Sequence, residues 1–151
     1  MVPHALLVII AATLLGAVLP KDARIKQDMQ QLQSLWRLSS QIRNGKAVPV
    51  DENQWMVLEI EADKYELRAN GKVIEEGTIR IDPDQKPKTM DLTATSVDNK
   101  GKTRAAVYEL ANKGVTLRIC WAEAGTDKRP KELVSKPESR HELLTYTNGK
   151  D

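Results

Sequence analysis

The first residues that could support chemistry are two aspartates, Asp82 and Asp84, in the segment IDPDQKPKTMDLT (residues 81–93). Alternating carboxylates are typical of calcium-binding loops, but such a loop also needs a glycine at its turn and a closing glutamate. This segment contains neither residue, and its lysines would compete with a cation for the carboxylates. Its prolines remove backbone donors and restrict the backbone. We therefore interpret residues 83–88 as a rigid, solvated connector between two strands, with a metal site as the alternative.

The second candidate is the pair formed by Cys120 and His141. Cys120 is the only cysteine, and His141 is the only histidine after the first 20 residues. They are therefore the only pair that could form a thiol–imidazole dyad, and cysteine and histidine alone cannot supply a zinc site. We expect Cys120 instead to be a buried, unreactive thiol covered by a helix near the N-terminus. We predict no catalytic residues, no metal and no cofactor.

Charged clusters could also bind a ligand. Glu75 and Glu76 are adjacent and fit solvated strand positions, although Glu76 could face inward, and carboxylates acting on a sugar must face each other across a cleft. A basic patch could bind acidic polymers or anionic lipid headgroups, or could be a solvated loop; it comprises Lys128, Arg129, Lys131, Lys136 and Arg140. The formal net charge is only +2, which is too small for a nucleic-acid-binding surface.

The elements that position these residues begin with an apolar segment. Residues Ala5 to Leu19 carry no charge, and this stretch is short for a membrane span but suits the apolar region of a signal peptide. We predict a signal peptide or uncleaved anchor over residues 1–20, so that only this segment contacts a membrane. The protein is then expected to be exported to the periplasm, the cell envelope or the medium.

An amphipathic helix is predicted over residues 21–33. Ile25, Met29 and Leu32 recur at i, i+4 and i+7 among polar residues, which places them on one helix face. We expect this helix to pack on the following domain as a plug, with binding to a partner as the alternative.

Residues 34–151 are predicted to be all-β. About eight short segments alternate with period two and are separated by turn residues, at 34–42, 54–60, 64–69, 72–82, 89–95, 103–110, 115–122 and 141–147. Asn70-Gly71 is a strong hairpin signal because both residues tolerate positive φ. Residues 43–52 and 123–140 are predicted to be loops. An antiparallel meander of this kind closes most naturally into a small barrel.

The register across two hairpins assigns the faces of the barrel. Pairing Ala69 with Lys72 requires a change of face farther along the return strand, and Gly77 is the expected site of a β-bulge. Around the turn at residues 111–114, pairing Tyr108 with Leu117 puts Trp121 on the core face, with Arg118 and Cys120 outside.

The interior of the barrel is the predicted binding site. Eight strands leave room for side chains or for one small ligand, and the candidate lining residues are Tyr65, Leu67, Tyr108, Leu117, Trp121 and Tyr146. We predict a non-catalytic binding module for a small apolar molecule. The alternative is a structural or protein-interaction domain of the cell envelope, with a filled core.

Several blocks of the chain resemble the uncharacterised planctomycete domain family: EEGTIRIDPDQKPKTMDLT, NKGKTRAAVYEL, VTLRICWA and KRPKELVSKPES. The resemblance covers roughly residues 32–146 and implies an exported, lipocalin-like domain with no established activity. The chain departs from it at Ser34, where the family has LQGTW, and at Leu133, where the family has Phe. In lipocalin-like barrels an early Trp closes one end against a late basic residue. Trp36 is therefore either a partner of Arg118 or a plain core residue.

Overall fold

The computed structural model describes residues 16–51 and 55–149. Most of the predicted apolar segment, Ala5 to Leu19, lies outside these residues. Within the described part of the chain, no helix has the length and apolar character needed to cross a membrane.

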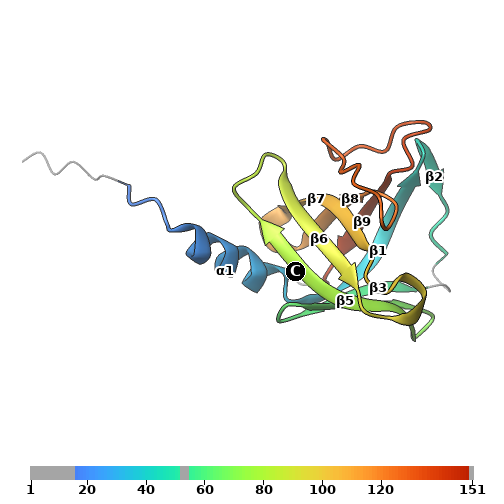
Figure 1. Cartoon of the computed structure of the whole chain (residues 1–151), viewed down its shortest axis with the longest axis horizontal. Coiled ribbons are helices and arrows are strands. Elements are labelled where there is room, and N and C mark those ends of the chain that lie inside the picture. Colours follow the sequence, from blue (N-terminus) through green and yellow to red (C-terminus); the bar gives the residue numbers. More distant parts are fainter. Residues whose placement is uncertain (1–15, 52–54, 150–151) are drawn as a thin grey trace, which may run out of the picture.

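The described residues form one antiparallel sheet that closes on itself (Figure 1). The strand order is β2-β1-β3-β4-β5-β6-β7-β8-β9, and β1 also pairs with β9. Eight strands therefore close into a barrel, β2 lies outside it as an additional strand, and the predicted all-β meander is confirmed.

In chain order the elements are α1 (Lys21–Leu32), β1 (Ser34–Arg43), β2 (Lys46–Val48), β3 (Met56–Glu61), β4 (Lys64–Ala69), β5 (Lys72–Asp82), β6 (Lys88–Ala94), β7 (Thr103–Ala111), β8 (Thr116–Trp121) and β9 (Glu142–Thr147). Two short 3-10 helices, Val97–Asn99 and Asn112–Gly114, flank β7.

The additional strand corrects the prediction of a loop over residues 43–52. Strand β2 folds back on β1 through a two-residue turn at Asn44-Gly45, with φ values of 50° and 76°. The predicted turn at Asn70-Gly71 has the same geometry, with φ values of 52° and 77°. Both turns use the Asn-Gly preference for positive φ, so the same signal was present at Asn44.

The predicted β-bulge at Gly77 is in the wrong place. Arg68 pairs with Val73 and Leu67 pairs with Glu75, so the extra residue is Ile74, three residues after Gly71. Ile74 therefore points outward, and Glu75, Gly77 and Ile79 face the interior. Gly77 is required for another reason, because a Cβ there would collide with the Thr93 carbonyl oxygen and lie 2.8 Å from Tyr65 Cε1.

The register of the β7–β8 hairpin differs from the prediction by two residues, but its faces do not. Tyr108 pairs with Ile119, and Leu110 pairs with Leu117. Because side chains alternate with period two, an even shift keeps every residue on its own face. Trp121 therefore points inward, and Arg118 and Cys120 point outward.

Helix α1 covers the end of the barrel at which β1 begins. Leu32 is fully buried in the barrel core, and Met29 packs against it. The Trp36 indole N–H donates to the Leu32 carbonyl oxygen at 2.9 Å, which ties the end of the helix to the first strand. Asp28 accepts hydrogen bonds from the Tyr108 hydroxyl and the Lys88 ammonium group, both at 2.7 Å.

Candidate functional site

Asp82 and Asp84 hold the helix rather than converge on a common site. Arg24 donates to the two carboxylate oxygens of Asp84 at 2.6 and 2.9 Å, and Lys21 donates to Asp82 at 3.3 Å. The hydrogen bond from Arg24 lowers the pKa of Asp84 below its ordinary value. No group of three or more His, Cys, Asp or Glu side chains that could hold a metal occurs among the described residues.

Cys120 and His141 are held by different partners. The Cys120 thiol is fully buried and lies 3.5 Å from the Val134 carbonyl oxygen, whereas His141 Nε2 lies 3.1 Å from the Lys128 carbonyl oxygen. The predicted cover of Cys120 by the helix is wrong, because the thiol packs in an outer cluster with Leu133 of the long loop. Burial raises the pKa of Cys120 to about 11, so the thiol is protonated and a poor nucleophile at neutral pH.

Trp36 is a core residue and Arg118 is not its partner. Trp36 is fully buried at the helix end of the barrel. The Arg118 guanidinium lies on the outer face, where it donates to Glu109 at 3.2 Å and to the Leu133 carbonyl oxygen at 3.4 Å.

The predicted lining residues are mostly packed against one another. Leu117, Tyr146, Tyr108, Tyr65, Leu67 and Trp121 all belong to the same core cluster and have at most 5% of their surface exposed. A cavity large enough for water would leave accessible area on the side chains around it. Leu117 and Tyr146 have none, so a ligand has no room beside them without rearrangement.

The barrel interior becomes polar toward the end opposite α1. Glu75 is only 4% exposed and accepts hydrogen bonds from the Tyr65 hydroxyl at 2.9 Å, Asn99 Nδ2 at 2.7 Å and the Arg104 guanidinium at 3.1 Å. Burial raises the pKa of Glu75, but these hydrogen bonds and the charge of Arg104 outweigh it and lower the pKa below its usual value. The carboxylate is therefore held ionised inside the barrel.

The expectation that Glu76 could face inward is wrong, because the glutamate that faces the interior is Glu75. The bulge lies at Ile74 rather than at Gly77, which exchanges the faces on which Glu75 and Glu76 lie. Arg104, by contrast, was predictable, because it lies two and four residues before Ala106 and Tyr108 on the same face of one strand.

A cavity of about 250 Å³ opens above this ion pair. Its lining residues are Arg43, Asn44, Arg104, Trp121, Ala122, Glu123, Arg140 and Glu142. The Arg104 guanidinium stacks over the Trp121 ring at 5.3 Å from the ring centroid. Glu142 accepts from Gln41 at 2.8 Å and pairs with Arg43 at 3.1 Å.

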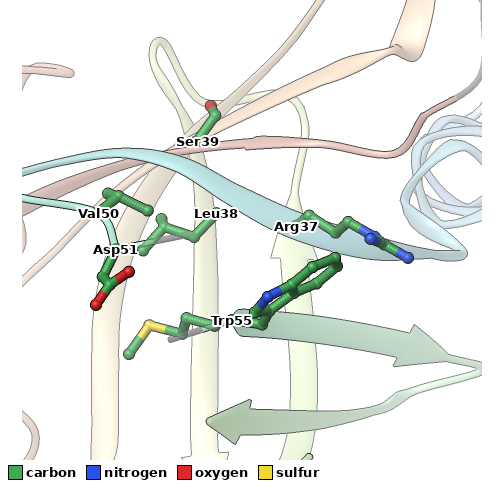
Figure 2. A pocket seen from close by; sticks show the side chains of 7 residues that line it. Arg37, Leu38, Ser39, Val50, Asp51 and Trp55 are labelled. Atoms are coloured by element: carbon green, nitrogen blue, oxygen red, sulfur yellow. The ribbon is translucent and has the colours of Figure 1, made fainter. Parts of the chain in front are cut away.

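A second concave region lies on the outer wall around Trp55 (Figure 2). One hollow has a volume of about 540 Å³ and is lined by Arg37, Leu38, Ser39, Val50, Asp51, Trp55 and Met56. A second hollow that Trp55 also lines has about 490 Å³, and its other lining residues are Leu35, Val57, Arg68, Asn70 and Gly71. We call these residues together the Trp55 surface.

Trp55 is 53% exposed, and Leu35 beside it is 42% exposed. Figure 2 shows the Arg37 side chain against the Trp55 ring, with the guanidinium carbon 4.8 Å from the ring centroid. Arg68 is neutralised by Glu59 at 2.9 Å and by Glu66. No ion pair of Arg37 occurs within the described residues, and the Asp51 carboxylate lines the same hollow.

Comparison with known proteins found no matching family model, no matching curated protein and no matching solved structure. The resemblance to the planctomycete domain family therefore remains a prediction.

Proposed function

We propose that this chain is a non-catalytic binding module that docks a protein partner through the Trp55 surface. The observation that supports the proposal is a half-exposed tryptophan between two hollows, on a barrel whose core near the helix is filled. Of the two functions expected from the sequence, this one corresponds to the protein-interaction domain. Export through the N-terminal segment and a lipocalin-like architecture are part of the same proposal.

The composition of the Trp55 surface favours a protein partner. Tryptophan and arginine are enriched among the residues that dominate interface energies, and the two hollows that Trp55 lines can receive apolar side chains. Strand β1 supplies Arg37, β3 supplies Val57 and β4 supplies Arg68, and Trp55 directly precedes β3, so most of the surface is carried by paired strands. A rigid wall lowers the entropic cost of docking.

The charge of the surface indicates the chemistry of the partner. Arg37 carries a positive charge beside Trp55 without a carboxylate partner in the described residues. A protein segment that places an apolar side chain next to an aspartate or glutamate would fill a hollow and pair with Arg37. We therefore infer an acidic, partly apolar segment as the occupant.

Selection of displayed peptides on the full chain tests this proposal. We expect enriched peptides to combine an apolar residue with Asp or Glu, and to lose binding to the Trp55→Ala and Arg37→Gln variants. Val134→Ala is the matched control, because Val134 is an apolar residue of similar exposure (47%) in the long loop before β9. Peptides that bind all variants equally would refute the proposal.

Sedimentation of the same variants distinguishes a second copy from a different partner. Self-association that is present in the native chain and lost in Trp55→Ala would identify another copy of this chain as the occupant, and would overturn the proposed acidic partner. A monomer at all concentrations supports the heterotypic partner.

A further inference from the structure

Residues 16–20, which join the apolar N-terminal residues to helix α1, form neither a helix nor a strand and are exposed. Val18 is 85% exposed and Leu19 is 50% exposed. A Cβ placed on Gly16 would meet no atom within 4 Å. An irregular, exposed segment of this kind can be drawn out into the extended strand in which a peptidase binds its substrate.

The contacts that attach the chain to the barrel begin at Leu19. The Arg24 guanidinium donates to the Leu19 carbonyl oxygen and to both carboxylate oxygens of Asp84. The Arg24 backbone N–H donates to the Pro20 carbonyl oxygen at 3.1 Å. A peptidase can therefore draw out the chain before Leu19 without breaking the contacts that hold α1.

The residue types in this segment favour one peptide bond. Peptidases that remove export signals cleave after a small residue, in an Ala-x-Ala-like pattern. Val18 and Leu19 are too large for the position before the bond, and Pro20 lacks the backbone N–H that an extended substrate donates. Gly16 and Ala17 are the small residues of the segment, and Ala17 matches the pattern.

Both sides of the Ala17–Val18 bond suit cleavage. On the released side, the uncharged residues 5–15 have a length within the about 7–15 residues typical of the apolar region of a signal peptide. On the retained side, Leu19 stays with α1, so Arg24 keeps both of its acceptors. A bond farther along the chain would cost Arg24 the Leu19 carbonyl oxygen.

We propose that the Ala17–Val18 bond is the processing site of this chain, cleaved during export by a peptidase that accepts a small side chain before the bond. Water adds across the amide, so that Ala17 ends the released segment with a carboxylate and Val18 begins the retained chain with an ammonium group. The barrel then leaves the membrane with α1 in place. This inference rests on the proposed export, and it decides between a removed signal peptide and a retained anchor.

Mass spectrometry of the exported chain tests the proposal. The full chain, with its own N-terminal segment, is produced in a bacterial host that exports proteins. The intact mass and the N-terminal sequence are then determined separately for the soluble and the membrane fractions. We expect the soluble chain to lack residues 1–17 and to begin at Val18.

Two leucine variants locate the bond. Ala17→Leu puts a large side chain directly before the proposed bond and should abolish the product that begins at Val18. Gly16→Leu puts the same side chain one residue earlier, where the Ala-x-Ala-like pattern sets no limit on size, and should be cleaved as the native chain is. Both residues are exposed, so the two variants, produced without export, should unfold at the same urea concentration as the native chain.

Four results would overturn the proposal. The soluble chain could begin at a residue other than Val18, or Gly16→Leu rather than Ala17→Leu could abolish the product. An uncut chain in the membrane fraction that added protease digests in whole cells or spheroplasts would identify a retained anchor and leave the proposed export intact. An uncut chain that is protected from that protease would overturn the export as well. Docking at the Trp55 surface is tested separately, by the peptide selection.

Discussion

Replacing Gly77 by alanine should strongly destabilise the barrel. Gly77 faces the interior between β4 and β6, where it pairs with Tyr65 on one side and with Ala94 on the other. An added Cβ would collide with the Thr93 carbonyl oxygen and lie 2.8 Å from both Thr93 C and Tyr65 Cε1. Because the nearest atoms belong to the backbone of a paired strand, a change of side-chain rotamer cannot relieve the contact.

The magnitude follows from two contributions. Overpacking in a filled core costs about 1–3 kcal/mol. Displacing the Tyr65 ring also weakens its hydrogen bond to the buried Glu75 carboxylate, and a bond to a charged group contributes about 1.5–3 kcal/mol. We expect a loss of about 3–5 kcal/mol in the free energy of unfolding, which corresponds to a decrease in Tm of about 10–20 °C for a domain of this size.

Urea unfolding followed by circular dichroism measures this loss. Gly16→Ala is the control, because a Cβ at Gly16 meets no atom within 4 Å. The double variant Gly77→Ala, Tyr65→Ala should not recover stability, since the collision with the Thr93 backbone persists. A Gly77→Ala protein that unfolds at the same urea concentration as the native chain would refute the placement of β5 against β6.

Two further predictions concern buried ionisable groups. The pKa of Glu75 is lower in the folded chain than its ordinary value of 4.5. At a pH below about 4.5 the unfolded chain therefore binds more protons than the folded chain, and the free energy of unfolding should decrease as the pH falls further. Urea midpoints measured against pH should show this fall, and Glu75→Gln should reduce it; an unchanged profile would argue against an ionised Glu75. Cys120 should react slowly with a soluble disulfide reagent at neutral pH, because its pKa is raised to about 11 and Leu133 covers it. Leu133→Ala should accelerate the reaction, and deletion of residues 21–32 should not. The reverse result would show that the helix, rather than Leu133, covers Cys120.

The core faces of β7 and β8 were predictable from the sequence because they follow a local rule. Side chains alternate with period two, so Tyr108, Leu117 and Trp121 were assigned to the interior even though the register was off by two residues. The turn at Asn70-Gly71 was predictable for a similar reason, since the conformational preference lies in the two residues themselves. The resulting expectation of an eight-stranded meander closing into a barrel is confirmed.

The position of the bulge was not predictable in the same way. Gly77 and Ile74 both allow the change of face that the pattern requires, and the sequence contains no local preference that decides between them. Pairing across two neighbouring strands decided it, because Gly77 is needed at the close approach to Thr93 and so cannot be the extra residue. Because the bulge was predicted at Gly77, Glu76 rather than Glu75 was expected to face the interior.

Contacts across the barrel depended entirely on the tertiary structure. The sequence by itself determined the strands that close the barrel and most of their inward faces, because each depends on neighbouring residues. It did not determine that Glu75 meets Arg104 across β6, that residues 123–140 cover Cys120, or that Trp55 remains exposed on the wall. These contacts join residues far apart in the chain, and their geometry is set by the tilt and closure of the whole sheet rather than by any local pattern.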